Sequence, residues 1–154
     1  MSRAIEETSG FALRPATSGD FDFAWSLYRE LMKPLTLELL AWNESGQRRT
    51  VEEALARQGA SVIVVREARC GWLHVNETPG EICLGQLYLT PAWQGRGIGG
   101  TIIRDLSDRA QQSGKRFTLD VMKNNRARVL YERLGFRVVA TSAYKLTMQW
   151  FATL

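Results

Sequence analysis

Apolar and polar residues alternate with two different periods along this chain of 154 residues. Short runs that are apolar throughout, or apolar at every second residue, are typical of β-strands. Seven such runs occur, at residues 11–15, 61–65, 71–75, 82–89, 117–122, 137–140 and 144–150. Segments with the three- and four-residue spacing of amphipathic helices lie between some of them. The pattern predicts a mixed α/β (α+β) protein.

Helices are predicted between the first and second strands. Four large apolar residues with helical spacing would share one face of the first helix: Phe21, Trp25, Tyr28 and Met32. Pro34 is predicted to end this helix or to begin another, since proline lacks the N–H that a helix interior needs. A polar stretch follows at residues 43–49. Thr50 and Glu53 then have the spacing of a capping box, which predicts the start of a further short helix.

Two more helices are predicted nearer the C-terminus. The first has five apolar residues on one face: Ile98, Ile102, Ile103, Leu106 and Ala110. The second has four residues at positions i, i+3, i+4 and i+7: Ala127, Leu130, Tyr131 and Leu134. Asn124 or Asn125 can cap the start of the second helix, and Gly135 suits the left-handed residue that ends one. On spacing alone, Tyr131 is a core residue of an amphipathic helix.

The predicted elements follow the order β-α-α-α-β-β-β-α-β-α-β-β. No internal repeat, low-complexity tract or linker interrupts them. With 45% hydrophobic residues, a chain of this length can bury a full core. We therefore expect a single domain over residues 1–154, with its core at residues 11–150 and an N-terminal extension at residues 1–10.

A glycine-rich segment lies between the strand at residues 82–89 and the helix that follows it. Its sequence is Gln94-Gly95-Arg96-Gly97-Ile98-Gly99-Gly100. Glycines let the backbone turn tightly, and the unpaired N–H groups and the dipole of a helix N-terminus favour an anion. The segment therefore predicts a phosphate-binding loop.

The same segment fits the spacing of the dinucleotide fingerprint. Gly95, Gly97 and Gly100 occupy its glycine positions, and Asp120 lies where a ribose-binding acid would follow. In a dinucleotide-binding fold, however, the first glycine comes almost directly after the strand and several βαβ units follow. Here residues 90–94 intervene, and only 54 residues follow Gly100. A nucleotide-binding oxidoreductase is therefore the weaker alternative.

Two motifs resemble those of the GNAT superfamily of acyl-CoA N-acyltransferases. Gln94-x-x-Gly97-x-Gly99 resembles the pyrophosphate loop of that family, which begins with Arg or Gln and ends with Gly or Ala. Asn124-x-x-Ala127-x-x-x-Tyr131, leading into Leu134-Gly135-Phe136, resembles its second CoA-contacting motif. The resemblance extends over residues 11–150 in the order of elements. It implies a GNAT-like mixed, mostly antiparallel central sheet of about seven strands flanked by helices, with a splayed strand pair for acyl-CoA.

The resemblance implies acetyl-CoA as the cosubstrate, with its extended arm between the strands at residues 82–89 and 117–122. The residues expected to bind it are Leu87, Leu89, Gln94, Gly95, Arg96, Gly97, Ile98, Gly99, Gly100, Asn124, Ala127 and Tyr131. In the family, a backbone N–H at the level of Leu89 is expected to polarise the thioester carbonyl. The phenol of Tyr131 is expected to face the CoA sulfur and to protonate the departing thiolate.

The implied reaction is transfer of an acetyl group to the primary amine of an unidentified small molecule or peptide, by direct attack through a tetrahedral intermediate. Many family members carry a glutamate six residues before the proline that precedes the loop, where this chain has Gly85. The remaining candidate bases are Glu44, His74 and an ordered water chain, although Glu44 fits a surface charge and His74 a packed strand residue equally well. The residues expected to contact the acceptor are Trp42, Glu44, His74 and Tyr144. The missing glutamate also favours an alternative, a non-catalytic acyl-CoA-binding or sensory module on the same fold.

Charge and composition limit the other partners. The net charge is +4, but the basic residues are scattered among acids, so nucleic acid is not an expected partner. Attraction of a polyanionic cofactor explains the small excess of Lys and Arg over Asp and Glu. The absence of an apolar run of about 18 residues and the polar start of the chain predict no membrane span and a cytoplasmic location. Cys70 and Cys83 lack metal-ligand spacing, so no metal is expected. The last strand, at residues 144–148, could pair across a twofold axis to form a homodimer.

Overall fold

The structure, a computed structural model, describes residues 10–153 of the chain. These residues form two compact units. Unit 1 contains the residues up to His74 together with Gln86–Ile98, and unit 2 contains Val75–Gly85 and the residues from Gly99 onward. Residues 1–9, most of the expected N-terminal extension, lie outside the described residues.

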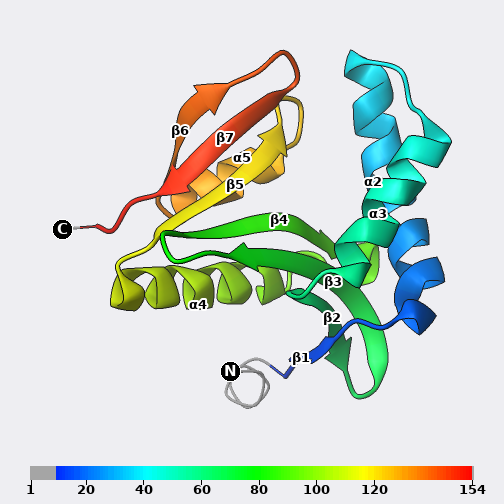
Figure 1. The fold of residues 1–154 in the computed structure, drawn as a ribbon, viewed down its shortest axis with the longest axis horizontal. Helices are drawn as coiled ribbons and strands as arrows, with labels where there is room; N and C mark the ends of the chain where they lie inside the picture. The colour runs from blue at the N-terminus through cyan, green and yellow to red at the C-terminus, as the bar shows by residue number, and fades with distance from the viewer. Residues whose placement is uncertain (1–9, 154) are drawn as a thin grey trace. The chain divides into compact units, whose positions relative to one another are not determined.

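Seven strands are present in the described residues, as the sequence predicts. They are β1 (Ala12–Pro15), β2 (Ala60–Val65), β3 (Ala68–Glu77), β4 (Glu81–Leu89), β5 (Arg116–Met122), β6 (Phe136–Thr141) and β7 (Lys145–Trp150). Their hydrogen bonds connect them in the order β1-β2-β3-β4-β5-β7-β6 (Figure 1). The β4–β5 pair is parallel, and β1–β2, β2–β3, β5–β7 and β6–β7 are antiparallel. The expected mostly antiparallel sheet is therefore confirmed.

The parallel pair of β4 and β5 is hydrogen-bonded only over the first part of each strand. The registered pairs end at Leu84 with Leu119. β4 continues to Leu89 and β5 continues to Met122, so the last residues of both strands lie outside this ladder. This ladder therefore does not use the backbone groups at the end of either strand, where the GNAT resemblance predicts a splayed pair.

β7 lies between two other strands of the sheet. It pairs with β5 on one side and with β6 on the other, so its backbone groups are used in both ladders. Among the described strands, the edges of the sheet are β1 and β6. Only an edge strand can add a partner through its backbone. The prediction that the last strand pairs across a twofold axis is therefore wrong.

Two long helices and two short 3-10 helices belong to unit 1. They are η1 (Ser18–Asp20), α2 (Phe21–Leu39), α3 (Glu44–Ala56) and η2 (Pro91–Trp93). Pro34 lies inside α2, so the prediction that it ends a helix is wrong. Pro34 is exposed whereas Thr36 is buried, which shows that the buried face of α2 continues past the proline. α3 begins after Asn43, whose Oδ1 accepts a hydrogen bond from the Gly46 N–H at 3.0 Å. The helix therefore starts well before the predicted capping box at Thr50, because Asn43 supplies an earlier cap.

The core of unit 1 lies between α2, α3 and the strands. α2 and α3 run side by side in this unit (Figure 1). The buried members of the cluster are Ala24, Leu27, Tyr28, Val51, Ala54 and Trp72. The fully buried Trp72 donates from Nε1 to the Ala24 carbonyl oxygen at 3.2 Å, so its one polar group is satisfied. Phe21, Trp25 and Met32 pack against the cluster, which confirms the predicted face of the first helix.

Unit 2 contains most of α4 (Ile98–Ser113) and all of α5 (Ala127–Arg133). The five apolar residues predicted on one face of α4 are at most 4% exposed. Burying a large aliphatic side chain contributes about 1.5–3 kcal/mol, so this face holds the helix in place. α5 has only seven residues, and Leu130 is 39% exposed. The predicted apolar face of this second helix is therefore only partly covered.

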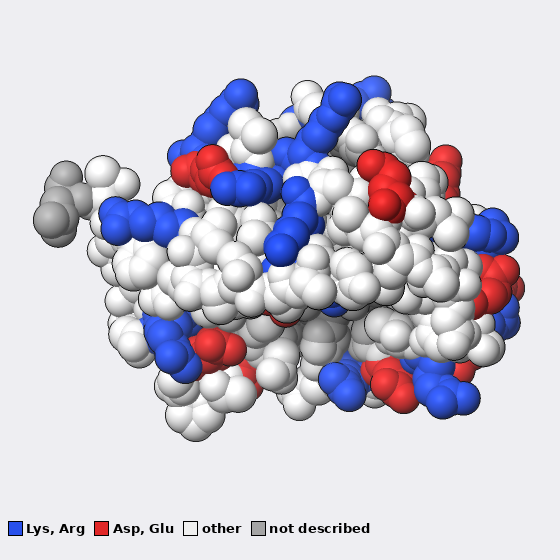
Figure 2. Space-filling view, turned by 90° about the horizontal axis from the view of Figure 1, so that it is seen from above, with Lys and Arg blue, Asp and Glu red and all other residues white. Residues whose placement is uncertain are grey.

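Acidic and basic side chains are interspersed on the face of the molecule that Figure 2 shows. In unit 2, Arg109 and Lys115 both pair with Glu77, and Arg128 pairs with Glu132. Exposed pairs of this kind contribute about 0–1 kcal/mol each. No helix in residues 10–153 is long and apolar enough to cross a bilayer.

Candidate functional site

Two hydrogen bonds, one from the backbone and one from a side chain, hold the start of the glycine-rich loop at the end of β4. The Thr90 N–H donates to the Cys70 carbonyl oxygen on β3 at 2.8 Å, after which η2 turns the chain. The Gln94 side chain then reaches back and donates from Nε2 to the Leu89 carbonyl oxygen at 2.9 Å. This bond ties the start of the loop to the last residue of β4, so the side chain of Gln94 positions the loop.

Two glycines determine the path of the loop. Gly95 and Gly97 have φ angles of +74° and +84°, a region that L side chains avoid. A Cβ at either position would meet no atom within 4 Å, so the backbone conformation rather than crowding requires glycine. Gly100 is different, because a Cβ there would meet only the side chain of Arg104, from 3.4 Å.

α4 begins directly after these glycines. Ile98 is its first residue and is 4% exposed, so it anchors the first turn. The first N–H groups of a helix have no intrahelical partner, and the helix dipole adds positive potential at this end. The backbone from Gly95 to Gly100 therefore offers several N–H groups to one anion, which suits a diphosphate.

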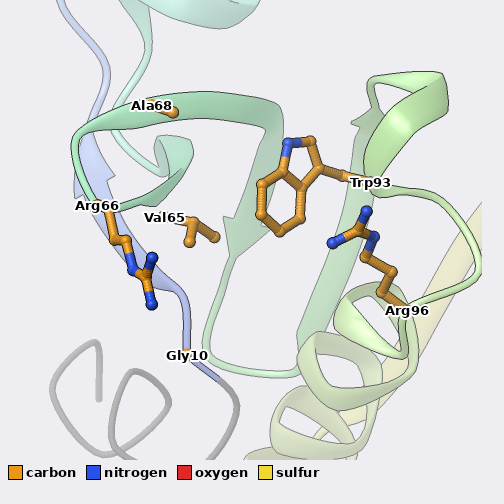
Figure 3. A pocket seen from close by; sticks show the side chains of 6 residues that line it. All are labelled: Gly10, Val65, Arg66, Ala68, Trp93 and Arg96. Carbon is orange, nitrogen blue, oxygen red and sulfur yellow. The ribbon is translucent and has the colours of Figure 1, made fainter.

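A pocket of about 530 Å³ adjoins the loop within unit 1. Its lining residues are Gly10, Val65, Arg66, Ala68, Trp93 and Arg96 (Figure 3). The Arg96 guanidinium lies over the Trp93 ring, 4.6 Å from its centroid, which is a favourable cation–π contact. The sequence indicated Arg96 as a site residue but not Arg66, which comes from the hairpin between β2 and β3, thirty residues earlier.

Leu87 and Leu89, the expected backbone contacts for the cofactor arm, lie near the end of β4 and are partly buried. Gly71 of β3 approaches this part of β4 closely. A Cβ on Gly71 would overlap the Tyr88 carbonyl oxygen and lie 3.1 Å from the Cα of Leu89. Glycine inside a strand often marks such a close approach of two backbones. Gly71 therefore fixes the backbone at the level of Leu89.

Tyr131 lies on α5 in unit 2. Its ring packs against Phe136 with a centroid distance of 5.9 Å. A phenol is protonated at neutral pH, and burial raises the pKa of the Tyr131 phenol, so the group stays protonated to still higher pH. Within the described part of the chain, the hydroxyl forms no hydrogen bond with another residue. Tyr131 is therefore a proton donor without a partner among residues 10–153.

Asn125 and Gly135 lie near the two ends of α5, but the N-cap is Arg126, so the prediction that Asn124 or Asn125 is the cap is wrong. Asn125 Oδ1 accepts a hydrogen bond from the Ala127 N–H at 2.9 Å and so orders the first turn. Gly135 ends the segment with a φ of +106°. Asn124 is partly buried just before this turn. Asn124, Ala127 and Tyr131 thus belong to one turn-and-helix segment of unit 2.

Trp42 and Glu44 form a hydrogen-bonded group where α2 connects to α3. The Trp42 Nε1–H donates to Glu44 Oε1 at 2.8 Å, and Arg29 Nε donates to the same oxygen at 2.9 Å. The Arg29 hydrogen bond, followed by that of Trp42, lowers the pKa of the Glu44 carboxyl. A carboxylate with a lowered pKa is a weaker base. This arrangement favours a positioning role for Glu44 over proton abstraction.

An aromatic cluster surrounds Trp42 in unit 1. The rings of Trp25, Tyr28 and Trp42 lie 6.2–6.3 Å apart, and Tyr88 of β4 meets Tyr28 edge to face at 5.4 Å. The Tyr28 hydroxyl donates to Gln47 Oε1 on α3. Only the helical spacing of Trp25 and Tyr28 was visible in the sequence, because Trp42 and Tyr88 approach these two residues through tertiary packing.

His74 and Tyr144, the other two expected acceptor contacts, lie on β3 and just before β7. His74 is 6% exposed on β3 opposite Ala60, and burial lowers the pKa of its imidazole. It is therefore neutral but enclosed, and its Nε2 has no hydrogen-bond partner among the described residues. Tyr144 precedes β7 in unit 2 and is 42% exposed. Of the four expected acceptor contacts, Trp42 and Glu44 share a hydrogen bond.

Residues 57–138, more than half of the chain, match the family described as the acetyltransferase (GNAT) domain. The chain belongs to the GNAT acetyltransferase family. No curated protein matches the sequence.

Solved GNAT-like structures share the fold of this chain. The PaiA N-acetyltransferase from Thermoplasma acidophilum, in complex with coenzyme A, has a TM-score of 0.70 at 16% identity, over 91% of this chain and 98% of that one. PH1933 from Pyrococcus horikoshii OT3 has a TM-score of 0.72 at 18% identity, over 94% and 99%. The ribosomal-protein-S18-alanine N-acetyltransferase from Escherichia coli has a TM-score of 0.64 at 16% identity, over 91% and 92%. At these identities the comparison shows a common fold.

Membership of the GNAT family makes this chain an acyltransferase that uses acetyl-CoA as its acetyl donor. It removes the oxidoreductase alternative, in which Asp120 would bind a ribose. In the structure, Asp120 Oδ1 accepts a hydrogen bond from Thr147 Oγ1 at 2.7 Å, between β5 and β7. The Asp120 carboxylate therefore has a structural partner within the sheet.

Proposed function

We propose that this GNAT acyltransferase transfers the acetyl group of acetyl-CoA to the primary amine of a small molecule or peptide, by direct attack through a tetrahedral intermediate. The observation that carries this proposal is Tyr131, whose phenol is buried and protonated and whose hydroxyl has no partner among the described residues. A structural tyrosine at such a position usually has a hydrogen-bond partner for its hydroxyl. A free donor on the CoA-contacting segment of a GNAT protein suits protonation of a thiolate.

The cofactor is proposed to lie along the backbone of the two motifs. The N–H groups from Gly95 to Gly100 would hold the diphosphate, with Ile98 fixing the helix start and Gln94 fixing the loop. The backbone of Leu87 and Leu89 would pair with the amides of the pantetheine arm, as in β-strand addition. Asn124 and Ala127 would contact the arm from the segment that carries Tyr131.

The acetyl transfer is proposed to need two groups of this chain at the reacting atoms. The amine nitrogen attacks the thioester carbonyl carbon, and the C–S bond of the resulting tetrahedral intermediate then breaks. The Leu89 N–H would donate to the oxyanion, and one such donor contributes about 3 kcal/mol to a transition state. Tyr131 would give its proton to the sulfur of the leaving CoA. Close packing of Gly71 supports this role of Leu89, because it fixes the strand end.

The proton of the attacking amine is proposed to leave through ordered water. Gly85 supplies no carboxylate at the position where many family members have a glutamate. The lowered pKa of Glu44 makes it a weak base, and His74 is enclosed in the sheet. Water needs only the acceptor amine to be neutral, so the rate should rise with pH until the amine is deprotonated.

The acceptor is proposed to meet the Trp42 and Glu44 group and the adjoining aromatic rings. The Escherichia coli structure of similar fold belongs to an enzyme named for an alanine of a ribosomal protein, so a peptide amine belongs among the candidates. The reaction is proposed to take place in the cytoplasm. The free thiols of Cys70 and Cys83 suit a reducing compartment.

Release of free CoA thiol from acetyl-CoA, measured across a panel of small amines and peptides, tests the proposal. Amine-dependent thiol release, with an equal amount of acetylated amine found by mass spectrometry, is the expected result. Calorimetric binding of CoA without amine-dependent release across the panel would contradict the proposed transfer. The absence of CoA binding would contradict the proposed cofactor site itself.

A further inference from the structure

The aromatic cluster of unit 1 connects the end of β4 with the segment between α2 and α3. Tyr88 comes directly before Leu89, whose N–H is proposed to donate to the oxyanion. The Tyr88 ring meets the Tyr28 ring edge to face at 5.4 Å, and the Tyr28 and Trp42 ring centroids are 6.2 Å apart. The rings of Trp25, Trp42 and Tyr88 are only partly buried. An acceptor amine that attacks a thioester held at Leu89 therefore has this cluster as a neighbour.

The polar donors of these rings are already used within the protein. The hydroxyls of Tyr28 and Tyr88 each donate to a glutamine side chain, and the Trp42 Nε1–H donates to Glu44. Binding sites for small molecules are lined mainly by apolar and aromatic surface, with a few polar groups that fix orientation. What these three rings offer to a bound molecule is therefore chiefly apolar surface.

The carboxylate of this site is accompanied by two cations. The Arg29 Nε donates to Glu44 at 2.9 Å, and this hydrogen bond is the main cause of the lowered pKa of Glu44. The charge of Lys33, also on α2, lowers that pKa further, so Lys33 acts on the same carboxylate. Two cations and one carboxylate leave an excess of one positive charge. An acceptor with a second ammonium group would meet this excess, and like charges that face each other disfavour binding.

Three leucines at the end of α2 add exposed apolar surface next to Trp42 in the sequence. Leu37 is 57% exposed, and Leu39 and Leu40 are each 37% exposed. Single exposed apolar residues are common, whereas several together are typical of a surface that binds a partner. The apolar surface thus continues along the chain from Trp42 to the end of α2.

We propose that the aromatic cluster and these three leucines select an acceptor in which the primary amine is attached to an apolar group and no second cation is present. This inference rests on the proposed function and narrows its acceptor to one chemical class. The products are the acetamide of that amine and free CoA. A free apolar amine and a peptide whose first residue is apolar both have this chemistry. Polyamines and aminoglycosides do not, because they carry further ammonium groups.

The rate of thiol release from acetyl-CoA with matched acceptors tests the proposal. The acceptors are 2-phenylethylamine, the polar 2-methoxyethylamine and the dication 1,4-diaminobutane, compared at equal concentrations of neutral amine. Burial of one apolar group predicts a kcat/KM for 2-phenylethylamine about tenfold to hundredfold above that of either other amine. Peptides that begin with phenylalanine or with serine form the second pair. A preference within the amines, within the peptides or within both supports the proposal and shows which source of the apolar amine is used.

Variants of exposed residues test whether this surface makes the selection. Leu37→Gln and Leu40→Gln should each lower kcat/KM for 2-phenylethylamine about threefold to tenfold and leave that for 2-methoxyethylamine unchanged. Because both leucines are exposed, the melting temperature should change little. Val139→Thr, at a valine of β6 that is 50% exposed, is the matched control and should change neither rate. Lys33→Glu should raise kcat/KM for 1,4-diaminobutane relative to 2-methoxyethylamine by about threefold or more.

Equal kcat/KM values for the three amines and for the two peptides, with normal turnover, would overturn this inference and leave the proposed function standing. A preference for 1,4-diaminobutane would overturn it in the same way. A preference for 2-phenylethylamine that survives in both leucine variants would overturn the assignment to this surface. A second copy of the chain is the other possible occupant of the leucines. A wild-type dimer that Leu37→Gln dissociates, with the acceptor preference unchanged, would identify that occupant and overturn the inference. No thiol release with any amine or peptide would overturn the proposed function itself.

Discussion

Replacing Tyr131 with phenylalanine separates the catalytic role of this residue from a packing role. The change removes one hydroxyl oxygen and keeps the ring against Phe136. Because this hydroxyl forms no hydrogen bond with another described residue, its removal leaves no donor or acceptor unpaired. The free energy of unfolding should therefore change by no more than about 0.5 kcal/mol.

The effect of Tyr131→Phe on the reaction should be much larger. A positioned general acid contributes about 10²- to 10⁴-fold, which corresponds to about 2.7–5.4 kcal/mol in the activation free energy. Thiol release under saturating acetyl-CoA measures kcat, and calorimetry measures the affinity for CoA. We expect kcat to fall at least about 100-fold, with the melting temperature and the Kd for CoA little changed.

Two further measurements connect the loss to the leaving thiolate. The thiolate that leaves from the acetyl thioester of a more acidic thiol needs less protonation. The ratio of wild-type kcat to Tyr131→Phe kcat should therefore be smaller with such acetyl donors. Because burial raises the pKa of the phenol, wild-type activity should not decline through loss of this proton below about pH 10. A kcat within about threefold of the wild type would refute the acid role and leave Tyr131 as a packing residue. A fall in the melting temperature of Tyr131→Phe large enough to explain its loss of activity would also assign Tyr131 a packing role.

Three other changes test the loop, a buried ion pair and a strand contact. Gly97→Ala should weaken CoA binding, measured by calorimetry, about tenfold, because a φ of +84° costs an L side chain about 1–2 kcal/mol. Gly100 has no positive φ, and a Cβ there would meet only the side chain of Arg104. Gly100→Ala should therefore change the Kd for CoA less than threefold. Asp20→Asn should lower the free energy of unfolding at pH 7 by roughly 2–3 kcal/mol in a urea titration, because the buried carboxylate accepts two 2.8 Å hydrogen bonds from an arginine. That guanidinium holds the pKa of the carboxyl well below its usual range, so the stabilisation is complete above about pH 4 and is lost as the pH falls through the lower, folded-state pKa. An equal loss of stability in wild type and variant between pH 7 and pH 3 would contradict this assignment. Gly71→Ala should lower the free energy of unfolding by at least about 3 kcal/mol, seen as a lower melting temperature, because the new Cβ would overlap a backbone oxygen of the facing strand. A variant with wild-type stability would show that the two strands can separate at this point.

Sequence periodicity was sufficient for the features that depend on nearby residues. The seven strands and the buried face of α4 follow from the spacing of apolar residues, because burial of one face imposes that spacing. The positive φ angles at Gly95, Gly97 and Gly135 occur where glycine stands next to the start or end of a helix. The family motifs occupy these same local turns, which explains why they could be recognised before any contact was known.

The sequence alone was misleading where a local signal competes with packing. Pro34 disfavours a helix interior, yet α2 continues through it because the buried side of the helix lies on the opposite face. Thr50 and Glu53 have the spacing of a cap, but Asn43 begins the helix earlier with its own side chain. Local preferences are worth about 1 kcal/mol, so the burial of a helix face outweighs them.

Only the tertiary structure determined which distant residues meet. The last strand enters the sheet between β5 and β6, which removes the edge that the sequence offered for dimerisation. Arg29 binds Glu44 and lowers the pKa of its carboxyl, so a candidate base becomes a positioning group. Arg66 reaches the pocket beside the loop through a tight hairpin. A periodic pattern in the sequence predicts which face of a helix or strand is buried. Strand order, hydrogen-bond partners and pKa shifts depend on which other elements that face packs against, and only the assembled fold determines those neighbours.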